Sequence, residues 1–325
     1  MTSCSTYLPD DLDALGDDIQ YTTTEFSPYL GRTTTFENIV TVSNNSTLPL
    51  TYEILDIKDQ DGISIKDLAD VKYPVKVWKK AYTGEETSIE EIESKRITEY
   101  RPAIDIQKKS GDIVFWNTLS KLNLQTAPYD GYTMDIAIGN TGGRKIQKGI
   151  KLIPYKERAY EPSQYDVSSG LASSAFLRPS ILFNVYGENT GNPVNDVRVY
   201  INKDYKNTKE GSTLTFSVVD SLNNIIPIDK FKDTKWNEFV HGFNHKFVDG
   251  KIVYDVIYPM PLINYPTKFT TSTGNRARSI LRYNRLGSGG FLQEAMLGFD
   301  FAIYEAGHWE IQFRFVGESP KFVNE

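Results

Sequence analysis

The feature that most constrains the fold of this chain is a two-residue alternation of apolar and polar side chains. In the clearest segment, the apolar positions are Leu297, Phe299, Phe301 and Ile303. Successive side chains of a β-strand point to opposite faces, so this alternation predicts strands with one buried and one exposed face. Long stretches with a helical period are almost absent. The sequence therefore predicts an all-β protein built from antiparallel sheets.

Three pairs of alternating segments are each separated by a short turn-forming sequence. They join residues 36–43 to 50–57, 132–139 to 146–153, and 297–303 to 309–315. Strands joined in this way pair as hairpins, so the sequence predicts three of them. Further alternating strands are predicted at 197–202, 214–218 and 252–258.

One short helix is predicted at residues 88–96. Ser88 and Glu91 have the spacing of a capping box, and Ile89 and Ile92 form one apolar stripe. We expect this helix to be an insertion in the first β domain.

The length of the chain favours two domains. At 325 residues it is long for one hydrophobic core but sufficient for two. Between residues 156 and 174 the alternation gives way to Tyr, Pro, Ser and Gly, a composition typical of linkers. We expect a disordered tether at 1–30, an immunoglobulin-like sandwich at 31–160, a linker at 161–179, and a second, jelly-roll-like sandwich at 180–325.

The charge balance limits the classes of partner. The chain has 36 Lys and Arg against 42 Asp and Glu, a formal net charge of -6, and no basic run interleaved with aromatics. Nucleic acid is therefore not an expected partner. No segment reaches the roughly 18 consecutive apolar residues of a membrane-spanning helix. Any membrane attachment is expected to be through a lipid anchor only.

Cys4 is the one cysteine of the chain, which excludes an internal disulfide. The sequence Thr2-Ser3-Cys4 resembles the end of a bacterial lipoprotein signal, where small residues precede a cysteine that is acylated after leader removal. No apolar leader precedes it, so we infer that the sequence begins late. We expect lipid attachment at Cys4 and a location on the outer membrane at the cell surface. The alternative interpretation is a free thiol near a terminus.

Signatures of catalysis and of metal binding are weak. His241 and His245 would share a face if residues 236–247 were helical, but the Asn, Gly and Phe around them favour a turn. No GxSxG motif is present, and the glycine-rich stretches lack the lysine of a phosphate loop. We expect no catalytic residue, no metal site and no cofactor. The many carboxylates leave glycoside hydrolysis open as an alternative.

Two tryptophans are the candidate ligand-binding residues. Trp78 and Trp236 lie among charged and amide residues, where a solvent-facing ring is able to stack on a sugar. The alternative is that each ring is partly buried for packing alone, as large aromatic side chains commonly are.

The chain from Cys4 to Glu325 resembles a family of Bacteroidetes surface lipoproteins built on a domain of unknown function. The resemblance rests on five segments: Tyr7-Leu8-Pro9-Asp10-Asp11, Leu30-Gly31-Arg32-Thr33-Thr34, residues 88–96, His241-Gly242-Phe243-Asn244-His245, and residues 298–305. It implies proximity to starch-utilisation-type outer-membrane uptake systems, and it carries over no activity or binding residue.

These observations predict a non-catalytic outer-surface lipoprotein. Its expected partner is a glycan or a component of the outer-membrane uptake machinery. A structural or adhesive surface protein is the alternative, and a glycoside hydrolase is the less favoured one.

Overall fold

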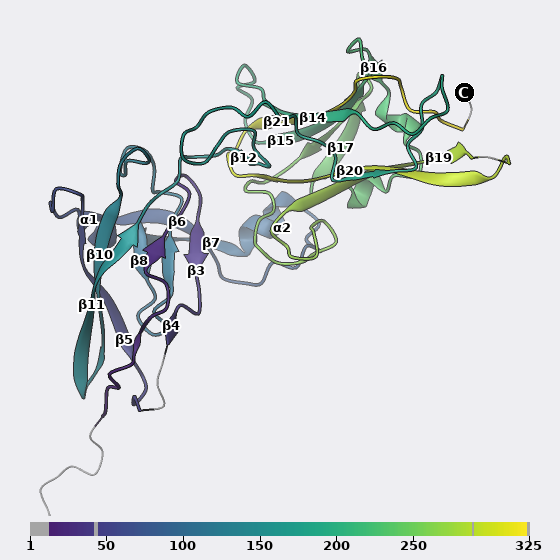
Figure 1. Ribbon diagram of the computed structural model, residues 1–325. Helices are drawn as coiled ribbons and strands as arrows, with labels where there is room; N and C mark the ends of the chain where they lie inside the picture. Colours follow the sequence, from purple (N-terminus) through teal and green to yellow (C-terminus); the bar gives the residue numbers. More distant parts are fainter. Residues whose placement is uncertain (1–12, 42–44, 288, 324–325) are drawn as a thin grey trace, which may run out of the picture. The chain divides into compact units, whose positions relative to one another are not determined.

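The computed structural model describes residues 13–41, 45–287 and 289–323, and its regular structure is almost entirely β-strand (Figure 1). The predicted all-β class is confirmed. The chain divides into two compact units: unit 1 comprises Met1–Val77, Thr98–Arg158 and Val167–Gly170, and unit 2 comprises Trp78–Ile97, Ala159–Asp166 and Leu171–Glu325. No helix in the described part of the chain is long and apolar enough to cross a membrane.

Unit 1 is built on short and medium strands. They are β1 Gln20–Tyr21, β2 Glu25–Phe26, β3 Thr34–Phe36, β4 Val40–Thr41, β5 Thr51–Lys58, β6 Lys72–Trp78, β7 Arg96–Pro102, β8 Ile104–Ile106, β9 Ile113–Phe115, β10 Tyr132–Asn140 and β11 Gly143–Leu152, with the short helix α1 Asp67–Asp70. One four-stranded sheet has the order β2-β11-β10-β5, and a three-stranded sheet has the order β3-β9-β8. The pairs β1-β4 and β6-β7 complete the unit, although Trp78 at the end of β6 and Arg96 and Ile97 at the start of β7 belong to unit 2.

The core of unit 1 lies between its two larger sheets. Ile54 and Ile136 of the four-stranded sheet and Ile113 and Phe115 of the three-stranded sheet belong to one buried cluster. Strand β5 buries alternate residues over its first half, because one of its faces meets this core. Unit 1 is therefore a sandwich, as predicted.

Two of the predicted hairpins have different outcomes in unit 1. Strand β10 pairs with β11 through a tight turn, which confirms the hairpin of 132–139 with 146–153. The hairpin of 36–43 with 50–57 is wrong, because β5 pairs with β10 while β3 pairs with β9 and β4 with β1. Asn38 has a φ of 56°, which breaks the segment into two short strands. Residues 42 and 43 lie outside the described residues.

The predicted disordered tether is wrong for its second half. Ile19, Tyr21, Phe26 and Leu30 are buried in the core of unit 1, and β2 runs parallel to β11. Burial of these four side chains outweighs the polar composition of the surrounding residues. Residues 1–12, which include Cys4, lie outside the described residues.

Helix α2, Ile89–Ser94, confirms the predicted helix but belongs to unit 2. Ser88 caps it by accepting a hydrogen bond from the Glu91 amide, and the Glu91 carboxylate accepts one from the Thr87 amide, 2.8 Å away. Ile92 is buried. The expectation that this helix decorates the first domain is wrong, because Ile92 lines a small cavity together with Met260 and Phe269 of unit 2.

Unit 2 contains two larger sheets. Its strands are β12 Tyr160–Glu161, β13 Ile181–Phe183, β14 Val197–Lys203, β15 Thr213–Val219, β16 Ile225–Ile226, β17 Phe243–Val248, β18 Lys251–Asp255, β19 Ala277–Leu286, β20 Leu292–Ile303 and β21 His308–Phe315, with 3-10 turns at Ile228–Lys230 and Trp236–Glu238. One sheet has the order β14-β21-β15-β18-β17 with β16 beside β15. The other has the order β12-β20-β13 with β19 beside β20.

The predicted closing hairpin of unit 2 is wrong. Strands β20 and β21 belong to different sheets, and the turn between them carries the chain from one sheet to the other. Phe299 of β20 meets Phe313 of β21 across the core, with ring centroids 6.4 Å apart. The alternation correctly marks the buried faces of both strands, but these faces pack against each other instead of lying side by side.

Two further expectations need correction. Strand β15 runs parallel to β21, so the sheets are not purely antiparallel. The predicted linker is also partly structured, because Glu161 pairs with Ala302 and Leu177 bridges to Val199.

Candidate functional site

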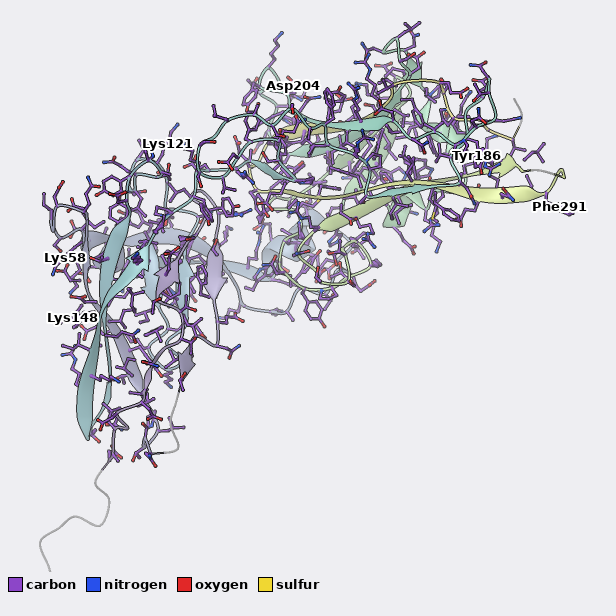
Figure 2. The ribbon with its side chains drawn as sticks, viewed as in Figure 1. Lys58, Lys121, Lys148, Tyr186, Asp204 and Phe291 are labelled. Atoms are coloured by element: carbon purple, nitrogen blue, oxygen red, sulfur yellow. The ribbon has the colours of Figure 1, made fainter. Side chains whose placement is uncertain are left out.

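A wide groove in unit 1 is the principal candidate site. It has a volume of about 1050 Å³, just above the range of about 300–1,000 Å³ typical of small-molecule sites. Strands β5, β7, β8, β10 and β11 and helix α1 all contribute to it. In Figure 2, Lys58 and Lys148 mark strands β5 and β11. The groove is lined by Thr51, Tyr52, Glu53, Ile54, Ala69, Asp70, Lys72, Glu99, Tyr100, Arg101, Pro102, Ile104, Asp105, Ile106, Lys108, Ala137, Gly139, Asn140, Gly143 and Arg144.

Small residues of the central strand β10 create the hollow. Ala137 lies opposite Glu53 of β5, and Gly139 lies between Thr51 of β5 and Arg144 of β11. A side chain at Gly139 does not fit, because its Cβ would lie 2.6 Å from the Gly143 carbonyl oxygen. The larger side chains of the flanking strands β5 and β11 therefore rise above the surface formed by Ala137 and Gly139 of β10.

An exposed ion pair spans this floor. The Arg144 guanidinium donates to the Glu53 carboxylate, with Nη2 and Oε2 2.7 Å apart. Both side chains are more than half exposed. The pair presents N–H donors and a carboxylate acceptor side by side to any molecule that enters the groove.

Arg101 organises a second polar cluster in the groove. Its Nε and Nη2 lie 3.0 and 2.7 Å from Glu99 Oε2, and its Nη1 lies 3.5 Å from Asp105 Oδ2. Glu99 and Arg101 are two residues apart on β7 and share a face, which places both charges together. One arginine thus pairs with two carboxylates.

Asp105 is the most buried charged group of the groove. Burial raises its pKa above the ordinary value, while Arg101, the Trp116 indole, Lys108 and Lys72 act in the opposite direction. A carboxyl group with this environment is able to hold a ligand hydroxyl or to act as an acid.

Tyr100 stands at the rim of the groove. Its side chain is 66 % exposed, although tyrosine is commonly half-buried. It lies between Glu99 and Arg101 on β7 and projects from the other face of that strand. An exposed ring among the residues that line the groove suits the apolar face of a sugar.

The two predicted tryptophans both lie in unit 2, and neither ring is fully exposed. Trp78 packs on Tyr82, with centroids 5.4 Å apart, and Arg96 lies over its ring. Trp236 packs against the unit 2 core and meets Phe247 edge-on at 5.3 Å. Phe247 itself is 48 % exposed, so the Trp236 edge adjoins an accessible aromatic surface.

His241 sits in a buried polar cluster of unit 2 and does not share a helix face with His245. The segment between them is a turn that leads into β17. The Nε2 of His241 lies 3.0 Å from the Glu86 carbonyl oxygen, and its Nδ1 bonds to the Tyr82 hydroxyl. Both ring nitrogens therefore have protein partners. Across residues 13–41, 45–287 and 289–323, no group of three or more His, Cys, Asp or Glu side chains is placed to share a metal ion.

A small apolar cavity adjoins His241. It has a volume of about 20 Å³ and is lined by Tyr82, Ile92, Met260 and Phe269, among others. One water needs roughly 10–15 Å³ measured in this way. The cavity is a packing gap with room for one or two waters, far smaller than the groove of unit 1.

Comparison with known proteins gives a family without a described activity. No curated protein matches the chain, and no solved structure matches it. Residues 41–324 match the profile of DUF5007, a domain of unknown function. This match spans most of the chain, and the protein therefore belongs to the DUF5007 family.

Proposed function

We propose that this protein is a non-catalytic, lipid-anchored protein of the outer cell surface that binds a glycan in the groove of unit 1. The groove itself is the observation that carries the proposal. It combines ligand-sized volume with an exposed tyrosine at its rim and two Arg–carboxylate pairs on its walls. Sugars are bound through such combinations of aromatic faces and planar polar groups.

The arrangement of the carboxylates supports binding over hydrolysis. A glycosidase needs one carboxyl group free to donate a proton and a second free to attack or to activate water. Glu99 and Asp105 instead share Arg101 between them. This pairing holds the carboxylates as fixed acceptors for sugar hydroxyls.

The binding experiment uses the whole chain against a panel of plant, host and microbial polysaccharides. We expect saturable binding that weakens by roughly tenfold or more in Tyr100→Ala, as for an interface hot spot. Tyr205→Ala is the matched control, because Tyr205 is 78 % exposed and lies outside the groove. Full binding by Tyr100→Ala together with loss in Trp236→Ala or Trp78→Ala would move the site to unit 2.

Glycoside hydrolysis is the second candidate, and one observation favours it. Asp105 has a raised pKa within a groove that also holds Glu99. Release of reducing ends from a bound polysaccharide, abolished by Asp105→Asn while binding persists, would establish an enzyme. Binding without product over prolonged incubation would support the non-catalytic role.

The surface location rests on Cys4 and its small preceding residues. The test is to label cells that express the gene with a fatty-acid probe. We expect a labelled protein that loses the label in Cys4→Ala, and persistence of the label would refute the assignment. A partner in the outer-membrane uptake machinery is tested by pull-down if the polysaccharide panel gives no binding. A structural or adhesive role follows if both experiments are negative.

A further inference from the structure

We infer that the groove of unit 1 selects charge-neutral glycans over sulfated or uronate-containing ones. This inference rests on the glycan-binding function proposed above and specifies the substrate class. It is carried by the distribution of charge along the groove.

The charges that line the groove balance. Four lining residues are cationic, Lys72, Arg101, Lys108 and Arg144, and four are anionic, Glu53, Asp70, Glu99 and Asp105. Sites for polyanions have an excess of basic side chains, which raises the local concentration of the ligand and its rate of association. This groove has no such excess.

The arginines are already engaged by carboxylates that also face the groove. Arg144 pairs with Glu53 at 2.7 Å, and Arg101 pairs with Glu99 at 2.7 Å and approaches Asp105 at 3.5 Å. A sulfate or carboxylate on the ligand would have to replace these partners and would then lie beside the displaced anion. Repulsion of this kind is an effective way to exclude a ligand.

The most buried carboxyl group of the groove also lies beside an arginine. Asp105 is only 8 % exposed, and its Oδ2 lies 3.5 Å from Arg101 Nη1. A buried side chain of this kind cannot swing into solvent to make room for an anionic sugar. Its carboxyl group therefore stays in the groove beside Arg101 and competes with an anionic sugar for that guanidinium.

Neutral sugar hydroxyls fit the same groups without displacing them. A hydroxyl donates one hydrogen bond and accepts others, so adjacent hydroxyls are able to bridge a guanidinium and its carboxylate. The pairs Arg144–Glu53 and Arg101–Glu99 each offer this combination. The exposed ring of Tyr100 adds an apolar surface that carries no charge.

The experiment compares neutral polysaccharides, such as β-glucan, mannan and starch, with anionic ones, such as polygalacturonate and chondroitin sulfate. Binding to the whole chain is measured by titration calorimetry at low and at high salt. We expect neutral glycans to bind with an affinity that changes less than about twofold with salt, since no ion pair forms with the ligand. We expect Tyr100→Ala to weaken this binding.

The outcomes separate the inference from the proposed function. Binding of anionic glycans alone, weakened by salt and by Tyr100→Ala, would overturn the inference and leave glycan binding in place. No binding to either class would overturn the proposed function and the inference with it.

A charge variant tests the mechanism directly. Glu53→Gln removes the anion that occupies Arg144, so we expect the variant to gain affinity for polygalacturonate at low salt. Glu37→Gln is the control, because Glu37 is an exposed carboxylate of unit 1 outside the groove. Equal affinity in the two variants would show that the paired carboxylate does not exclude anions, against the inference.

Discussion

The imidazole Nε2 of His241 lies 3.0 Å from the main-chain oxygen of Glu86, a residue 155 positions earlier in the chain. A carbonyl oxygen only accepts, so Nε2 carries the hydrogen, and Nδ1 accepts one from the Tyr82 hydroxyl. These bonds hold the neutral imidazole. They also tie the segment Trp78–Ile97, from the first third of the sequence, into unit 2.

His241→Phe is therefore expected to destabilise unit 2. The variant leaves the Tyr82 hydroxyl and the Glu86 carbonyl buried without their partner, at a cost of about 1–3 kcal/mol for each group. Urea unfolding, followed together with hydrogen exchange of residues 84–92, measures the loss. His245→Phe is the control, since His245 is only half-buried. Equal unfolding midpoints for the two variants would contradict the role assigned to His241.

Because of the same residue, the free energy of unfolding is expected to decrease as the pH is lowered below about 6.5. Burial lowers the pKa of His241 from its ordinary value of 6.5, against the opposing effect of Glu86. Below that value the unfolded chain binds a proton that the folded protein does not, so acid favours unfolding. Urea midpoints between about pH 7.5 and about pH 5.5 span this range.

The variant His241→Gln isolates this effect. Gln is able to donate and accept as the neutral imidazole does, but it does not titrate. We expect a lower stability at neutral pH and a weaker dependence on pH over the same range. An unchanged pH dependence would assign the effect to another group.

A second acid transition is expected at lower pH from Glu86. Burial alone would raise its pKa, but hydrogen bonds from Lys95 and from the Thr83 and Gly84 amides prevail and lower it from 4.5 to about 2. Its contribution is complete above pH 4.5 and is lost as the pH falls toward 2. In Glu86→Gln, the stability should fall less steeply over this lower range, while carboxylates such as Asp56 and Asp220, whose pKa values are also lowered, still titrate. A transition of unchanged size in the variant would refute the assignment.

The capping of α2 gives a smaller and more local prediction. Ser88 Oγ accepts from the Glu91 amide at 3.1 Å, and replacement of such a cap by Ala costs about 1 kcal/mol. Ser88→Ala should lower the protection of the Glu91 amide against hydrogen exchange. Ser88→Asp keeps an acceptor at the cap and should restore it. Failure of Asp to restore protection would mean that the hydroxyl acts in some other way.

The sequence predicted which faces are buried better than which strands pair. The hairpin of β10 and β11 was predictable, because alternation and the turn at residues 140–143 lie within one short segment. Strands β20 and β21 carry equally clear alternation, and their apolar faces are buried as predicted. The alternation shows which face of a strand is buried but not which strand it pairs with. A connection that crosses between two sheets therefore has the same sequence pattern as a hairpin.

The N-terminal strands were missed for a related reason. Ile19 and Tyr21 do alternate, but the polar residues around them mask so short a signal. A strand of two residues has too few positions for a pattern to emerge. The position of such a strand is determined by the sheet that it joins, and that sheet forms only when segments distant in the sequence pair.

The groove was missed because its chemistry is assembled from separate strands. Glu99, Tyr100 and Arg101 lie in a charged segment without an apolar period, which carries no sign of a site. The sequence signal that could have indicated the site was the spacing of Glu99 and Arg101, which places both charged side chains on one face of a strand. Its other wall, formed by Glu53 and Arg144, comes from residues 91 positions apart, and their contact depends on the pairing of β5, β10 and β11.

Gly111→Ala should destabilise unit 1 more than Gly62→Ala, although both glycines have a φ of +79°. The shared left-handed conformation costs each variant about 1–2 kcal/mol. Around Gly62 nothing lies within 4 Å, whereas a Cβ at Gly111 would lie 2.8 Å from the Tyr52 ring and 2.9 Å from Val40 Cγ2. Overpacking of this kind adds about 1–3 kcal/mol.

The same two variants test whether a packing change in the core of unit 1 affects ligand binding in the groove. Tyr52 packs next to Gly111 and is also among the residues that line the groove, so a displaced Tyr52 in Gly111→Ala changes part of that lining. We expect Gly111→Ala to bind glycan more weakly at a temperature where it is fully folded, and Gly62→Ala to bind as the parent does. Calorimetric titration and thermal unfolding of both variants decide the matter. Unaltered binding by a destabilised Gly111→Ala would place the ligand away from Tyr52.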